Sequence, residues 1–173
     1  GTNLMNKHVI EIDYYRRVLK FYEPSEFKLN TGEYEKVKIH YVGSYPTIQC
    51  SLLIRDKKYS GYFGLDSGAS DALTIASPYV RKHALKDKTQ QIASATFQGS
   101  DGSSYEMPIV LCPELKVGKK SFYAIPINLS SAKEGIDASE DMAGFFGNNF
   151  LKRFNTILDL ESGFIYFKPN ENL

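Results

Sequence analysis

The 173-residue chain has no tryptophan, only two cysteines and only three histidines. Cys50 and Cys112 stand far apart in the sequence, and no Cys-x-x-Cys motif or Cys/His cluster accompanies them. This pattern argues against a structural zinc site, so we expect no metal centre. Two cysteines can form one disulfide or remain as two buried thiols, and the sequence leaves both states open.

An excess of charge of either sign is also lacking, since 21 Lys and Arg residues face 20 Asp and Glu residues. The resulting formal charge of +1 creates no field that would attract nucleic acid, so we expect no nucleic-acid partner. No run approaches the ~20 apolar residues that span a bilayer, and we expect no membrane-spanning segment.

Several sequence motifs of enzymes are missing as well. There is no P-loop and no G-x-G-x-x-G, so we expect no nucleotide or other organic cofactor. A serine hydrolase would carry G-x-S-x-G, but Ser67 follows Gly64-Leu65-Asp66 and stands one position away from that pattern. The scattered histidines do not suggest a catalytic triad.

What the chain does contain predicts an all-β protein with few short helices. Apolar residues make up 42% of the chain and charged residues 24%, as in an ordinary globular protein. Aromatic and β-branched residues dominate the periodic segments, and long helical patterns are scarce. We expect two strands within residues 9–22, and further strands at 36–42, 48–54, 59–65, 72–75, 92–97, 104–110, 122–129, 156–160 and 164–167.

Two short helices and one long loop complete the expected elements. Ser77 followed by Pro78 predicts a helix that ends near residue 84, with Ser77 as its N-cap. Asn148 or Asn149 is expected to cap a second short helix. Residues 130–142 are polar and aperiodic, which predicts a surface loop.

A weak internal repeat links the two ends of the chain. "VIEIDYYRRVLKFYEP" begins at Val9 and "TILDLESGFIYFKP" begins at Thr156. Each has an apolar strand that closes on an aspartate (Asp13 or Asp159), then a turn, a second apolar strand and a proline. Any two hairpins of similar length would look alike, but repeats of this kind also mark repeated structural units.

The stretch "GYFGLDSGAS", residues 61–70, places a carboxylate directly after an apolar strand. The loop that follows must solvate Asp66, because a buried free carboxylate is costly. Ser67 can supply a hydroxyl, Gly68 allows a tight turn that points amides at the carboxylate, and Ala69 leaves room above it. Asp, Ser and Gly are also common in ordinary strand corners, so this motif by itself leaves both interpretations open.

A second element, "GFFGNNFL", favours the functional interpretation, with Gly147 standing 81 positions after Asp66. Together the two motifs resemble the retropepsin-like lobe of aspartic peptidases, over about residues 35–169. The shared order is an apolar strand, D-[ST]-G-A, a flap hairpin, and two apolar residues with a glycine that lead into a short helix. The resemblance implies a retropepsin-like, closed β-barrel lobe of the acid-protease fold.

The resemblance also implies roles for individual residues. Asp66 matches the catalytic aspartate, Ser67 the hydroxyl that braces two catalytic loops, and Gly68 the amide donor beside the carboxylate, with Ala69 in the same loop. The remaining matches are Phe145, Phe146 and Gly147 for the psi-loop through which the aspartate strand passes, and Gly99, Ser100, Asp101 and Gly102 for the flap.

The implied activity is that of an aspartic endopeptidase lobe acting on a polypeptide substrate. Such enzymes need two carboxylates roughly 3 Å apart that share one proton, so that one activates water and the other donates to the peptide carbonyl. This chain offers a single D-[ST]-G. The second aspartate must come from an upstream lobe or from a homodimer partner, and the chain alone is expected to be catalytically silent.

The repeat favours the upstream lobe. In this interpretation residues 1–30 are the closing hairpin of a preceding lobe plus a linker, and residues 31–173 are the retropepsin-like lobe. The alternative is a catalytically inactive peptide-binding or assembly module with the same fold. The resemblance to exported bacterial relatives also implies an extracytoplasmic location, periplasmic or secreted.

Overall fold

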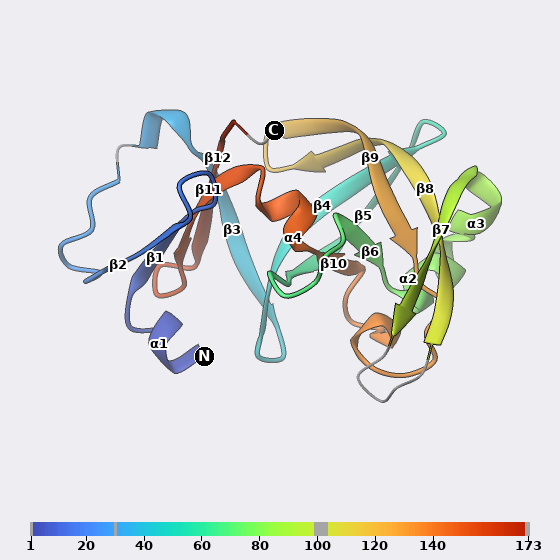
Figure 1. Ribbon diagram of the computed structural model, residues 1–173, viewed down its shortest axis with the longest axis horizontal. Coiled ribbons are helices and arrows are strands. Elements are labelled where there is room, and N and C mark those ends of the chain that lie inside the picture. Colours follow the sequence, from blue (N-terminus) through green and yellow to red (C-terminus); the bar gives the residue numbers. More distant parts are fainter. Residues whose placement is uncertain (1, 30, 99–103, 172–173) are drawn as a thin grey trace.

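The computed structural model describes residues 2–29, 31–98 and 104–171, and these form mostly β-sheet with a few short helices (Figure 1). The all-β prediction is therefore confirmed. The strands are β1 (Val9–Asp13), β2 (Val18–Tyr22), β3 (Glu35–Val42), β4 (Tyr45–Ile54), β5 (Lys57–Leu65), β6 (Leu73–Ile75), β7 (Gln91–Gln98), β8 (Ser104–Val117), β9 (Lys120–Leu129), β10 (Gly144–Phe146), β11 (Phe154–Asp159) and β12 (Phe164–Pro169). The helices are α1 (Thr2–Met5), α2 (Ser77–His83), α3 (Leu85–Lys88) and α4 (Asn148–Leu151), with 3-10 turns η1 (Thr31–Glu33) and η2 (Ile136–Ala138).

Strand β8 extends further than the predicted 104–110. Its buried positions alternate through Val110 and Cys112 and then resume at Leu115 and Val117, so the inward-facing phase shifts at Pro113. The ladder to β9 also passes over Pro113. A strand whose alternation changes phase looks like two segments in a sequence pattern, which explains the short prediction.

Both predicted helix N-caps are wrong. Helix α2 begins at Ser77 itself, with Ala76 as the N-cap, and the buried Ser77 hydroxyl donates instead to the carbonyl of Ala132 at 2.6 Å. Helix α4 is capped by Gly147, and Asn148 is its first helical residue. The Ser77 hydroxyl therefore bonds to a carbonyl that is distant in the sequence and does not cap the helix N-terminus in the way that the capping rule predicts.

The prediction of a surface loop at residues 130–142 is only partly right. Ser130, Ala132 and Met142 are buried at its two ends, while the middle contains η2, in which Ile136 is exposed and no residue is buried. The amide of Ser130 donates to the carbonyl of Ile75, which ties the start of the loop to the end of β6.

The strands form one continuous hydrogen-bonded set in the order β2-β1-β11-β12-β3-β4-β5-β10-β6-β9-β8-β7. Strand β8 also pairs with β4, so the pairings run in a ring from β4 through β5, β10, β6, β9 and β8 back to β4. Strand β3 connects this ring to the remaining strands, because its first half pairs with β12 and its second half with β4. The two groups of strands lie at opposite ends of the molecule in Figure 1.

The two terminal hairpins lie side by side, as the repeat predicts. Strand β1 pairs with β2 and also, antiparallel, with β11, which in turn pairs with β12. Both hairpin ladders have the same register after a shift of 146 positions, the separation of Asp13 and Asp159. The Asp13 carboxylate accepts the amide of Arg16 at 2.9 Å, and the Asp159 carboxylate accepts the amide of Ser162 at 3.0 Å. The hairpins are therefore structurally equivalent units.

The pairing between the hairpins shows how they are related. Ile10 pairs with Leu158, and Ile12 pairs with Thr156. When each residue is replaced by its equivalent 146 positions away, the first pair becomes the second. A local pseudo-twofold axis therefore passes between Glu11 and Ile157, which face each other.

The main core fills the interior of the strand ring and continues to the terminal hairpins. Its largest fully buried side chains include Phe63, Phe146, Phe150 and Phe154. Burial of one such side chain contributes roughly 1.5–3 kcal/mol. Among the described residues, no helix has both the length and the apolar character needed to cross a bilayer.

Candidate functional site

Asp66 follows β5 directly, and the backbone around it solvates its carboxylate as predicted. The Asp66 amide donates to the carbonyl of Phe146 at 2.8 Å, which fixes the start of the loop. The amide of Gly68 donates to the Asp66 Oδ1 at 2.9 Å. Asp66 is partly buried, whereas Ser67 and Gly68 are exposed. The carboxylate therefore lies at the surface of the strand ring with one oxygen held by an amide.

The role of Gly68 needs one correction. Its backbone is not among the glycines with positive φ, so the turn does not demand glycine for conformational freedom. A Cβ at this position would instead lie 3.2 Å from the Asp66 Oδ1. This contact is tight, but it falls on a side-chain oxygen that can shift, so the packing does not strictly require glycine at this position.

Strand β10 lies between two strands that are consecutive in the chain. It runs parallel to β5 and antiparallel to β6, although β5 and β6 are joined directly by the loop that contains Asp66. Beyond β10, the amide of Gly147 donates to the carbonyl of Ala72 at 3.1 Å, and the amide of Asn148 donates to that of Ala69 at 2.7 Å. The structure thus brings Phe145, Phe146 and Gly147 against the Asp66 loop.

Glycines permit this close approach. A Cβ on Gly147 would lie 2.3 Å from the carbonyl oxygen of Asp71, a backbone atom of the Asp66 loop. A Cβ on Gly64 would lie 2.6 Å from the Phe145 ring and 2.8 Å from the Tyr45 ring. Real Cβ atoms do not come so near to other atoms, so each glycine is required by the packing.

Tyr45 is a neighbour of Asp66 that the sequence did not indicate. It begins β4, and its ring packs edge-to-face on Phe145 with 5.6 Å between centroids. Burial raises the pKa of Tyr45, and the negative charge of Asp66 raises it further. A tyrosine at a strand start is common, and only the pairing of β3, β4 and β5 shows that it lies near this carboxylate.

Asp71 is a second carboxylate in the same loop that sequence reasoning did not assign. Its Oδ2 accepts the Thr74 hydroxyl at 3.2 Å, and Asn128 donates to the Thr74 oxygen at 3.3 Å. Burial raises the pKa of Asp71, and hydrogen bonds from Thr74 and Asn128 oppose that shift. This network ties the loop to β6 and β9, so we interpret Asp71 as structural support for the loop.

The proposed flap lies largely outside the described residues. Strands β7 and β8 form a hairpin whose ladder runs as far as Gln98 and Ser104, which agrees with the predicted hairpin. Gly99, Ser100, Asp101 and Gly102, assigned to the flap, fall outside the residues that the structure describes.

The structure answers the question left open for the cysteines. Cys50 and Cys112 are both free and buried, and burial raises the pKa of both thiols, that of Cys112 to about 11. Within the described part of the chain, no three His, Cys, Asp or Glu side chains gather as a metal site would need.

Comparisons with known proteins add little. No model of a known protein family matches the chain, and no curated protein matches it. Among solved structures, the chain is similar to a Legionella pneumophila protein of unknown function, with 16% identity, a TM-score of 0.31, and coverage of 58% of this chain and 79% of that one. It is also similar to basic 7S globulin from soybean, with 7% identity, a TM-score of 0.46, and coverage of 96% of this chain and 51% of that one. The chain thus spans about half of the soybean protein's length, and both likenesses are too weak to assign a fold or a function.

Proposed function

We propose that this chain is a retropepsin-like aspartic peptidase lobe in which Asp66 is one of two catalytic carboxylates. The observation that carries the proposal is the interlock of the Asp66 loop with residues 144–149, in which β10 lies between the consecutive strands β5 and β6. An ordinary strand corner needs no such crossing. The ring of pairings closed by β4 and β8 supports a closed barrel as the body of this lobe.

The chemistry follows from one carboxylate held in this way. In a dyad, the ionised aspartate takes a proton from water, which attacks the peptide carbonyl, while the protonated aspartate donates to the carbonyl oxygen. The Gly68 amide on the Asp66 Oδ1 holds this carboxylate in one orientation and leaves its other oxygen for water or substrate. The Ser67 hydroxyl makes no hydrogen bond within the described residues, so it is available to brace a second loop.

The terminal hairpins support an upstream lobe as the source of the second aspartate. In the C-terminal hairpin, the outer edge of β12 pairs with β3. The equivalent strand of the N-terminal hairpin is β2, whose outer edge has no partner strand in the described part of the chain. Val18, Leu19 and Phe21 of β2 are exposed. A strand from a preceding lobe, equivalent to β3, would pair with the free backbone edge of β2 and complete the pseudo-twofold arrangement, and the body of that lobe could pack on these side chains.

The decisive test measures cleavage of an unfolded protein substrate by the full-length natural protein, from acidic to neutral pH. Asp66→Asn keeps the shape of the side chain and removes its titration, so turnover should fall by about a hundredfold or more while the melting temperature holds. Asp141→Asn, at an exposed position, is the matched control and should leave turnover unchanged.

Two results would contradict the proposal. Undiminished cleavage by Asp66→Asn would exclude Asp66 from the chemistry. A natural protein that cleaves nothing but binds unfolded peptides, and binds them equally well after the Asp66→Asn substitution, would instead support the inactive peptide-binding module.

A further inference from the structure

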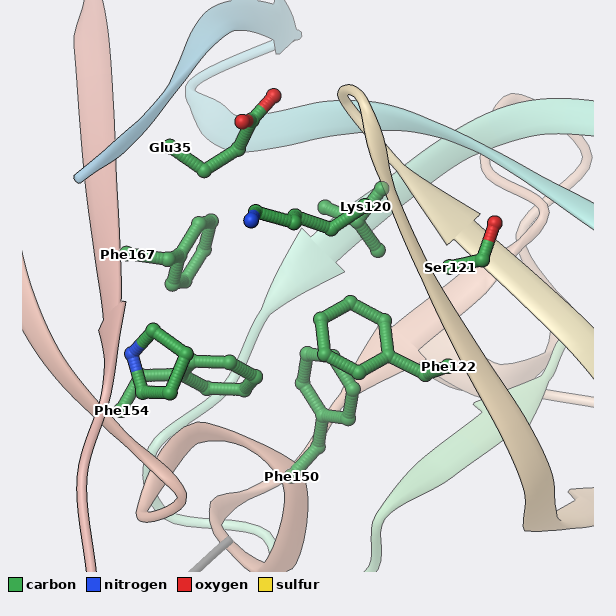
Figure 2. A pocket seen from close by; sticks show the side chains of 9 residues that line it. Glu35, Lys120, Ser121, Phe122, Phe150, Phe154 and Phe167 are labelled. Atoms are coloured by element: carbon green, nitrogen blue, oxygen red, sulfur yellow. The ribbon is translucent and has the colours of Figure 1, made fainter. Parts of the chain in front are cut away.

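A cavity of about 210 Å³ lies apart from the proposed catalytic site, and Asp66 does not line it. Its walls come from four separate segments: the β8–β9 turn, α4, β11 with β12, and the start of β3 (Figure 2). The residues that line it are Glu35, Val117, Lys120, Ser121, Phe122, Phe150, Phe154, Phe167 and Pro169.

The walls are aromatic and held in place by one another. Phe122 packs edge-to-face on Phe150 and on Phe154, with 5.3 Å and 5.4 Å between centroids. Phe154 also packs on Phe167 at 5.5 Å. Phe150, Phe154 and Phe167 are almost fully buried. Such edge-to-face pairs favour fixed ring orientations, so the cavity exists before any ligand arrives.

The volume sets the size of an occupant. A water molecule takes about 30 Å³ in the liquid, so this space equals about seven waters, and an apolar cavity of comparable size binds benzene in preference to water. The aromatic lining offers few hydrogen bonds to water. An apolar group of about six to eight carbons suits the cavity.

The mouth of the cavity carries a cation, Lys120, for which the described residues provide no ion-pair partner. Lys120 is exposed and takes part in none of the ion pairs among the described residues. Figure 2 shows its side chain reaching across the mouth toward Phe167, with the carboxylate of Glu35 turned away from the rings. Glu35 is already engaged, since its Oε1 accepts the amide of Lys119 at 2.7 Å.

We infer that this cavity binds a small amphiphilic carboxylate, with the alkyl or aryl body among the four phenylalanines and the carboxylate on Lys120. The ammonium group lies within reach of solvent at the mouth, where a ligand headgroup would lie. The charge of Lys120 favours an acid over an amine or an alcohol of the same length, because its ammonium group reaches across the mouth. The Glu35 carboxylate keeps its negative charge, but it is turned away from the rings and is held by the Lys119 amide.

The experiment titrates the 173-residue chain with octanoate, octanol and octylammonium, and follows backbone amide resonances by NMR. Octanoate should shift resonances of the cavity residues saturably and bind most tightly of the three. Lys120→Gln should weaken octanoate about two- to fivefold, as expected for an exposed ion pair, and leave octanol binding unchanged. Lys119→Gln is the matched control, since its side chain does not line the cavity.

A second variant gives an independent signal. Phe122→Trp narrows the cavity and introduces the only tryptophan of the chain, at a partly exposed position. Its fluorescence should change saturably with octanoate. Absence of saturation in the NMR titration of the unchanged chain at ~10 mM, ten times a Kd of about 1 mM, would overturn the inference, and so would octylammonium binding as tightly as octanoate.

Discussion

Gly147 offers the sharpest stability test of the interlock beside Asp66. In Gly147→Ala the new Cβ would lie 2.3 Å from the carbonyl oxygen of Asp71 and 3.1 Å from that of Ala69. Both are backbone atoms and cannot rotate away. The Gly147 backbone itself, with φ of −97° and ψ of 178°, suits any residue, so the whole cost arises from the collision.

The size of the loss in folding free energy follows from the backbone segments that must move apart. Relieving the contact separates the Asp66 loop from residues 147–149, which overpacks the site at a cost of about 1–3 kcal/mol. The same movement strains the hydrogen bonds that the amides of Gly147 and Asn148 donate to this loop, each of which contributes about 0.5–1.5 kcal/mol to stability. A net loss of about 2 kcal/mol or more should lower the melting temperature by roughly 4–8 °C, even after the small gain from removing a glycine.

Thermal unfolding followed by circular dichroism measures this effect. Gly68→Ala is the matched control in the same loop, because its Cβ would meet only the Asp66 Oδ1, at 3.2 Å, and a side-chain oxygen can shift. We expect its melting temperature to stay within about 2 °C of the wild type. If Gly147→Ala melts no lower than Gly68→Ala, the packing argument for the interlock is wrong.

Three further predictions concern other parts of the molecule. Burial raises the pKa of Asp71, so the folded state holds the carboxyl proton more tightly than the unfolded chain does. The stability that this proton contributes is present below about pH 4 and is lost as the pH rises through the raised pKa. Asp71→Asn should flatten that part of a stability–pH profile. Cys50 and Cys112 are buried with raised pKa, so a thiol reagent at neutral pH should label both only as fast as the chain opens, and labelling within seconds would contradict their placement. The exposed apolar edge of β2 should make the isolated chain self-associate, and Leu19→Lys should reduce the sedimentation coefficient at high concentration; equal association by both would show that β2 is not the contact.

Much of the fold was predictable because strand alternation is a local signal. Val37 and Ile39 are buried and their neighbours are not, as the period of two in residues 36–42 requires. The helix caps were not predictable in the same way. The Ser77 hydroxyl bonds to Ala132, 55 positions away, so a local capping rule had to compete with a tertiary contact that no short window contains.

In the candidate site, too, the residues that local motifs indicate differ from those that only the structure reveals. The adjacency of Asp66 and Gly147 was implied by the resemblance to a known family, which two short motifs carry. Tyr45 has no such pattern, and it comes close to the site only because β4 pairs with β5, the strand that leads to Asp66. Asp71 lies in the same loop as Asp66, but its supporting role depends on Thr74 and on Asn128, a residue of the distant strand β9. Residues that take part through the pairing of distant strands are therefore the ones that a sequence pattern leaves out.

The terminal hairpins share backbone conformation even where their residues differ. Gly163 turns its hairpin with a φ of +75°, and the residue at the same place in the other hairpin is Arg17, with a φ of +57°. Such a conformation costs an arginine more free energy than a glycine, so the hairpin geometry, and not the residue, determines the turn. The outer edge of β12 pairs with β3, whereas the outer edge of β2 has no partner strand in the described residues. Under the function we propose, a strand from a preceding lobe would pair with β2 and make the two halves alike, and the same lobe would supply the second aspartate.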